Sequence, residues 1–113
     1  MPSSQTLMKP VLESNAMNTQ EWIDKNKNGR MVIPCKMRFA DGNTMSVQAS
    51  RCHYCIPRED SGPWSHVELG YPTFTPELIM EYCEDPYRPT ATVYGFVPIG
   101  LVDCLANLHG GIV

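Results

Sequence analysis

The chain has 113 residues, a length that fits a single domain with one small core. Its formal charge is −3 at pH 7, so the charge balance does not favour duplex nucleic acid, and we expect no such partner. There is no run of about 18 apolar residues, and residues 1–14 are too polar for a secretory signal. We therefore expect no membrane partner and a cytoplasmic location.

The N-terminal segment is predicted to be an arm followed by a short helix. Residues 1–17 have no clear hydrophobic period, and we expect them to be mobile. Asn18 followed by Glu21 is typical of a helix-capping pair, and the helix is predicted to run to about Asn26. Trp22 must be buried, and a neighbouring subunit is one place for it. Together with Ile23 and an apolar C-terminal helix, it predicts a homo-oligomer.

Three strands are predicted next. Residues 31–39 are β-like, although Pro34 cannot donate a ladder hydrogen bond, so the strand begins after it or lies at an edge. Asp41-Gly42 indicates a hairpin, because glycine tolerates the positive φ of tight turns. Residues 44–50 form the returning strand and residues 64–69 a third strand.

The remaining elements are predicted to be a helix, a strand and a helix. Thr75 followed by a proline is typical of a helix start, and residues 75–84 have an amphipathic pattern. The apolar face is predicted to contain Leu78, Ile79 and Tyr82, and the acidic face Glu77, Glu81 and Glu84. Residues 90–97 have high β propensity, and Gly95 within them indicates a bulge or a close backbone approach. A final helix is predicted to begin at Pro98.

The predicted element order is β-β-β-α-β-α after an N-terminal arm. We therefore expect an α+β fold, a small antiparallel sheet with two short helices. The chain is interpreted as one domain over residues 1–113, with its globular core at residues 31–113.

A polar loop between the second and third strands contains Cys52, His53, Tyr54 and Cys55. The two thiols have one half of a zinc-binding pattern, but the second close pair of ligands is missing, so we expect no metal. No base or acid is placed by sequence to activate a thiol, and no phosphate-binding glycine loop is present. We therefore expect no enzyme and no cofactor; a zinc-stabilised interaction module is one alternative.

Arginine and aromatic side chains are concentrated in the connecting loops and on the last strand. Guanidinium groups bind phosphates, and flat rings stack on bases, so this combination is typical of a small nucleotide site. A second interpretation is that the aromatic residues belong to the core and the arginines are solvated. The candidate ligand-binding residues are Arg51, His53, Tyr54, Arg58, Arg88, Tyr94 and Phe96.

Four stretches between about residues 39 and 112 together resemble a phage-encoded family, the anti-Thoeris signal sponges. They are SVQASRCHYCIPRED, GPWSHVELGYP, EYCEDP and TVYGFVPIGLVDCLANLHGG. The resemblance implies a homo-oligomer in the infected bacterial cell that binds a cyclic ADP-ribose type of signal without cleaving it. It also implies ligand pockets built from arginine and aromatic side chains. The first thirty residues are not covered.

The leading hypothesis is therefore a non-enzymatic protein that sequesters a small cyclic nucleotide signal. The alternative is a small phage inhibitor that acts by protein–protein contact, as anti-CRISPR proteins do, with the acidic residues of the predicted 75–84 helix or the N-terminal arm as its surface. The two hypotheses differ in one respect. The arginine and aromatic residues should line a pocket in the first case and lie flat on the surface in the second.

Overall fold

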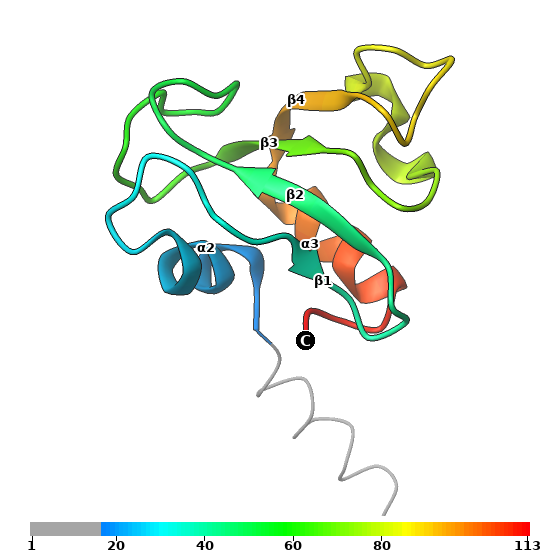
Figure 1. The fold of residues 1–113 in the computed structure, drawn as a ribbon, viewed down its shortest axis with the longest axis horizontal. Helices are drawn as coiled ribbons and strands as arrows, with labels where there is room; N and C mark the ends of the chain where they lie inside the picture. Colours follow the sequence, from blue (N-terminus) through cyan, green and yellow to red (C-terminus); the bar gives the residue numbers. More distant parts are fainter. Residues whose placement is uncertain (1–16) are drawn as a thin grey trace, which may run out of the picture.

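The computed structural model describes residues 17–113, so nearly all of the arm predicted at residues 1–17 lies outside the described residues (Figure 1). The elements in chain order are α2 (Thr19–Lys27), β1 (Met37–Arg38), β2 (Thr44–Gln48), β3 (His66–Gly70), the 3₁₀ helix η1 (Glu77–Tyr82), β4 (Val93–Pro98) and α3 (Ile99–Leu108). No helix within residues 17–113 is long and apolar enough to cross a membrane.

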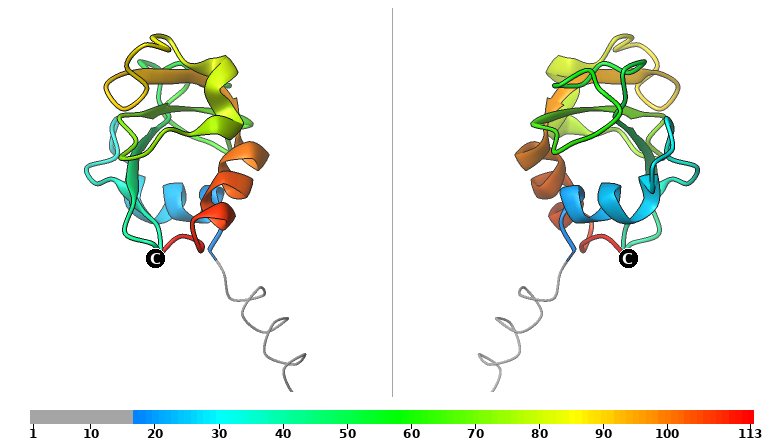
Figure 2. Two further views of the ribbon diagram at one scale, coloured as in Figure 1. Left: turned by 90° about the vertical axis from the view of Figure 1, so that its right-hand side faces the viewer. Right: turned by 90° about the vertical axis from the view of Figure 1, so that its left-hand side faces the viewer.

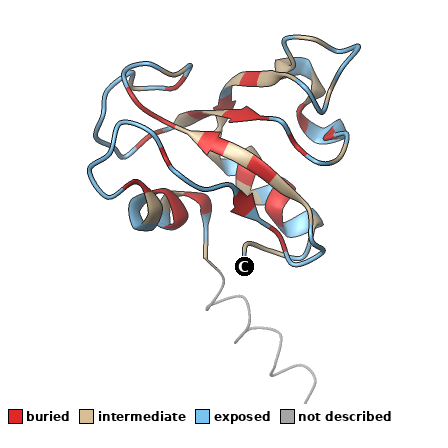
Figure 3. Cartoon of the chain, viewed as in Figure 1, coloured by how far each residue is buried: buried red, intermediate tan, exposed pale blue. Residues whose placement is uncertain are grey.

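The four strands form one antiparallel sheet in the order β1-β2-β3-β4, which confirms the predicted α+β class. The helices α2 and α3 meet each other on one side of this curved sheet (Figure 2). The inward residues of β2 and β3 alternate with half-exposed ones, as expected for a sheet that is covered on one face. The core lies between this sheet and the two helices, and the connecting loops are mostly exposed (Figure 3).

The predicted hairpin at Asp41-Gly42 is confirmed. Phe39 and Asn43 are joined by a backbone hydrogen bond of 2.9 Å, which leaves three residues in the turn. Gly42 adopts a φ of 93°, a conformation that favours glycine in three-residue hairpin loops. The hairpin fixes the register in which Met37 lies opposite Met45, and both side chains are fully buried.

The strand predicted at residues 31–39 is much shorter than expected, because its first half is held by a side chain instead of a strand. The Gln48 side chain accepts a hydrogen bond from the Ile33 amide at 2.8 Å and donates one to the Ile33 carbonyl at 2.9 Å. Only β1 forms regular sheet pairs. A side-chain amide therefore satisfies the backbone groups that a longer strand would have paired.

The helix predicted at residues 75–84 is a short 3₁₀ helix. Thr75 provides no side-chain cap, and Ile79 has non-helical backbone angles (φ −122°, ψ 18°) within η1. Leu78 was predicted to share the apolar face but is exposed, and Ile79 is the buried residue of this element. A 3₁₀ segment is common in short connectors, and here its kink replaces the amphipathic α-helical face.

The helix α2 belongs to the globular part of the molecule, so the core begins well before residue 31. Asn18 and Glu21 form the predicted capping box. Trp22 and Ile23 are buried in the core of their own chain, and they no longer support the prediction of a homo-oligomer. The α2 backbone is also tied to α3, because the Thr19 amide donates a 2.8 Å hydrogen bond to the Asp103 carboxylate.

Candidate functional site

The most irregular part of the sheet is a bulge in β4. Val67 pairs with Val97 and Leu69 with Tyr94, so β4 has one more residue than β3 between the two pairs. The extra residue lets both Tyr94 and Val97 face the core, where both are fully buried. The bulge predicted around Gly95 is thereby confirmed. Bulges commonly redirect a side chain next to a functional site.

The side chain that this bulge redirects is Phe96. Its φ of 54° lies in the left-handed region, which is costly for a bulky aromatic residue, and its side chain is 41% exposed. The Phe96 amide donates a 3.0 Å hydrogen bond to the Tyr54 carbonyl, which holds the strained backbone in place. A strained residue that exposes a large ring supports a functional role better than a packing role.

The backbone of Tyr54 is held by hydrogen bonds at both its carbonyl and its amide. Its carbonyl accepts the Phe96 hydrogen bond, and its amide donates a 2.9 Å hydrogen bond to the Glu68 carboxylate. Gly95 makes this approach possible, because a Cβ at that position would lie 3.1 Å from the Tyr54 Cβ. The close backbone approach predicted at Gly95 is therefore also confirmed. Tyr54 is thus held by its backbone while the residue remains exposed.

The Tyr54 ring contacts both Phe96 and Arg58, and we call these three side chains the platform. The centroids of the two rings are 5.6 Å apart at an interplanar angle of 36°. The Arg58 guanidinium carbon lies 5.7 Å from the Tyr54 centroid, within the range of a cation–π contact. Three of the seven predicted ligand-binding residues therefore meet, although they come from a loop and from the last strand.

An open pocket of about 420 Å³ adjoins the platform, a volume within the range of small-molecule sites. Tyr54, Gly95 and Phe96 line one part of it, and residues of η1 and the turn after it line the rest. These additional lining residues are Glu81, Tyr82 and Glu84. The pocket is therefore lined by three aromatic residues and two glutamates.

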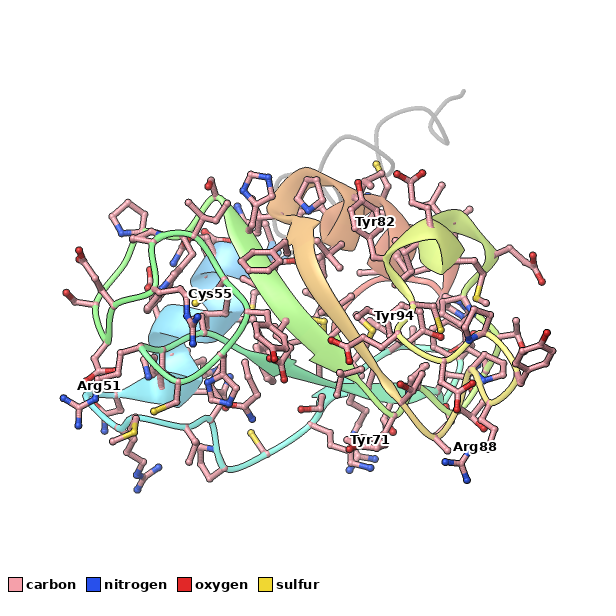
Figure 4. The ribbon with its side chains drawn as sticks, turned by 90° about the horizontal axis from the view of Figure 1, so that it is seen from above. Arg51, Cys55, Tyr71, Tyr82, Arg88 and Tyr94 are labelled. Atoms are coloured by element: carbon pink, nitrogen blue, oxygen red, sulfur yellow. The ribbon has the colours of Figure 1, made fainter. Side chains whose placement is uncertain are left out.

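Two of the predicted arginines do not line the pocket. Arg51 pairs with Asp60, with Nε 3.7 Å from Oδ2, and Arg88 pairs with Asp85 at 3.3 Å. Figure 4 shows Arg51 and Arg88 at opposite ends of the molecule. No single compact ligand on the platform can reach both of them, and we leave them out of the site.

His53 and Tyr94 are placed to stabilise the loop and the core. Nδ1 of His53 is 2.6 Å from the Ser50 hydroxyl, and burial lowers the pKa of His53. The Tyr94 ring is fully buried, and its hydroxyl donates a 2.7 Å hydrogen bond to the Pro89 carbonyl. Tyr94 offers no free ring face, so only Phe96 of the two aromatic candidates on β4 is left for stacking.

The two thiols of the polar loop are in different environments. Cys52 is exposed, whereas Cys55 is buried with its Sγ 3.1 Å from the Ser50 carbonyl. Burial raises the pKa of Cys55, which keeps it in the unreactive thiol form. Within residues 17–113, no three side chains of His, Cys, Asp or Glu are placed to hold a metal ion.

The sequence did not identify the wall formed by η1 as part of the site. Glu81 and Glu84 were noted only as an acidic helical face, and Tyr82 was assigned to the buried face. A 3₁₀ helix turns its side chains by a different angle from an α-helix, so the helical pattern could not place them beside Phe96.

Comparison with known proteins gave no matching family model, no similar curated sequence and no similar solved structure. The geometry of the platform and its pocket is therefore the basis of the functional proposal.

Proposed function

We propose that this protein is a non-catalytic binder of a small nucleotide signal, which it holds against the platform. The observation in support is that Arg58 and Phe96 both contact the exposed Tyr54 ring next to a pocket. A base stacks on the exposed rings, and a phosphate binds the Arg58 guanidinium. Cyclic ADP-ribose isomers, the ligands implied by the sequence resemblance, contain both groups. Sequestration of a phage-sensing signal in the host cell would then need only affinity and abundance.

Two structural features favour binding over chemical turnover. The buried Cys55 is held as a thiol. His53 follows Cys52 in the sequence, and its Nδ1 is already hydrogen-bonded to the Ser50 hydroxyl. The strained Phe96 backbone is pre-organised for contact, which lowers the entropy lost when a ligand binds.

Calorimetry with cyclic ADP-ribose isomers and cyclic oligonucleotides tests this proposal. At least one of them should bind with a Kd below about 10 μM, the range in which sequestration can compete with a receptor. Chromatography of the ligand released by heating should return it intact. Absence of binding in that range would overturn the proposal, and a cleaved ligand would show that the protein is an enzyme.

A matched pair of variants locates the ligand. Tyr54→Ala removes an exposed ring but keeps both backbone hydrogen bonds, and it should weaken binding at least about tenfold. Tyr87→Ala removes a ring that is 95% exposed and outside the platform, and it should leave the affinity unchanged. Equal losses in the two variants would place the ligand elsewhere.

A second candidate is the inhibitor that acts by protein–protein contact. It is favoured by the exposed Tyr71, Tyr87 and Arg88, because tyrosine and arginine are enriched at interfaces. Tyr71 also has a left-handed φ of 50°, a second strained aromatic residue. In that case Tyr87→Ala combined with Arg88→Ala should abolish the biological effect, whereas Tyr54→Ala should not.

A further inference from the structure

The charge of the pocket differs from that of the platform beside it. Glu81 and Glu84 line the pocket and are exposed, while Arg58 contacts the Tyr54 ring without lining the pocket. In the described part of the chain, neither glutamate takes part in an ion pair. The pocket therefore has two uncompensated negative charges, and the adjoining platform has one positive charge.

The aromatic lining adds to this negative potential. The face of an aromatic ring is electron-rich and attracts a cation within about 6 Å of its centroid. Tyr54, Tyr82 and Phe96 all line the same pocket as the two carboxylates. A positively charged flat ring gains both stacking and Coulomb attraction there, whereas a phosphate is repelled by the carboxylates.

We propose, on the basis of the proposed function, that this pocket selects nucleotides whose base is positively charged. The cationic base enters the pocket towards Glu81 and Glu84, and the phosphate remains outside at Arg58. The separation of the two charged regions thus determines the orientation of the bound nucleotide as well as the charge of the base that it prefers. Neutral bases stack on the same rings without the attraction of the carboxylates.

Two isomeric nucleotides separate charge from size. The purine of 1-methyladenosine 5′-monophosphate is cationic at pH 7, and that of N6-methyladenosine 5′-monophosphate is neutral. Both have the same phosphate, the same ribose and one added methyl group. In calorimetry at low ionic strength, the cationic isomer should bind the wild-type protein at least about tenfold more tightly.

Most of the preference should come from the two pocket carboxylates. In the double variant Glu81→Gln with Glu84→Gln, the preference for the cationic isomer should fall several-fold, and the remainder is the cation–π attraction of the rings. Glu77→Gln is the matched control, because Glu77 lies on the same 3₁₀ helix, is exposed and does not line the pocket. It should keep the full preference.

Equal binding of the isomers to the wild-type protein, or a preference of undiminished size in the double variant, would overturn the inference and leave the proposed function standing. Failure of both isomers to bind would also overturn it, because the cationic purine is the class that the pocket should select. The proposed function is decided separately, by the titration with cyclic nucleotides.

Discussion

Two aromatic clusters of this protein have similar compositions and opposite properties. The platform combines two rings with an arginine. The second cluster, which we call the C-terminal cluster, packs Phe39 and Phe74 against His109, with ring centroids 4.1 to 6.1 Å apart. His109 is also paired with Asp41, with Nδ1 2.6 Å from Oδ2. Each cluster therefore contains rings in contact and a charged or titratable group.

The difference lies in what each cluster leaves accessible. Phe39 is 1% exposed, and the C-terminal segment is fastened over this region by backbone hydrogen bonds from Ala40 to Gly111 and from Val113 to Arg38. In the platform both rings are more than two-fifths exposed, and Phe96 has a strained backbone. Aromatic residues near a charge thus indicate a binding site only where the rings are exposed and the backbone is held in a costly conformation.

The largest effect is expected in the C-terminal cluster. Phe39→Ala removes a fully buried ring and should lower the free energy of unfolding by about 3–5 kcal/mol, as measured by chemical denaturation. A loss below about 1 kcal/mol would show that this cluster is not part of the core, and the contrast with the platform would fail.

Arg58→Ala should weaken nucleotide binding about tenfold, because it removes the guanidinium next to the platform. Arg51→Ala is the control, since Arg51 lies in the same loop but is paired with Asp60. Calorimetry with the tightest ligand of the panel compares the two. Equal losses would mean that the loop attracts the ligand only through its general charge.

Tyr94→Phe should lower stability by about 1 kcal/mol and leave binding unchanged. The buried hydroxyl donates to the Pro89 carbonyl at 2.7 Å, and burial raises the pKa of Tyr94, so the group remains a donor. Thermal unfolding and calorimetry on the same preparation check this. A loss of affinity without a loss of stability would return Tyr94 to the binding site.

The smallest effect is expected on the pH dependence of stability. Hydrogen bonds from the Asn43 amide and from His109 hold the pKa of Asp41 below its ordinary value of 3.8. The ionised Asp41 carboxylate therefore stabilises the folded state above pH 3.8. This stabilisation is lost as the pH falls through the lower pKa of the folded state. Between about pH 6 and about pH 3, the melting temperature of Asp41→Asn should therefore fall less than that of the wild type. Parallel curves for the two proteins would contradict the assignment.

The regular parts of the fold could be predicted because their signals are local. The Asp41-Gly42 turn, the alternation in residues 44–50 and the Asn18–Glu21 capping box each depend on neighbouring residues. The strand at residues 31–39 was wrong in length because the backbone of Ile33 is paired with the Gln48 side chain, fifteen residues away in the sequence. No local pattern predicts such a substitute for a strand.

The candidate site could be predicted only in part for the same reason. Tyr54, Arg58 and Phe96 were among the predicted residues, and Gly95 indicated the bulge that places them. The sequence did not distinguish Phe96 from Tyr94, because strict alternation puts both on one face of β4. The inserted residue of the bulge sends Tyr94 into the core and Phe96 outward.

The most direct test of the binding role of the platform is one variant in which stability and binding should separate. Phe96→Gly removes the exposed ring and relieves the left-handed backbone, because glycine adopts a φ of 54° without strain. Calorimetry with the tightest-binding nucleotide should show a loss of roughly tenfold to a hundredfold, the value of one stacked base. The melting temperature of the same preparation should stay close to that of the wild type. Unchanged affinity, or a protein that no longer folds, would contradict the claim that Phe96 is strained for the purpose of binding.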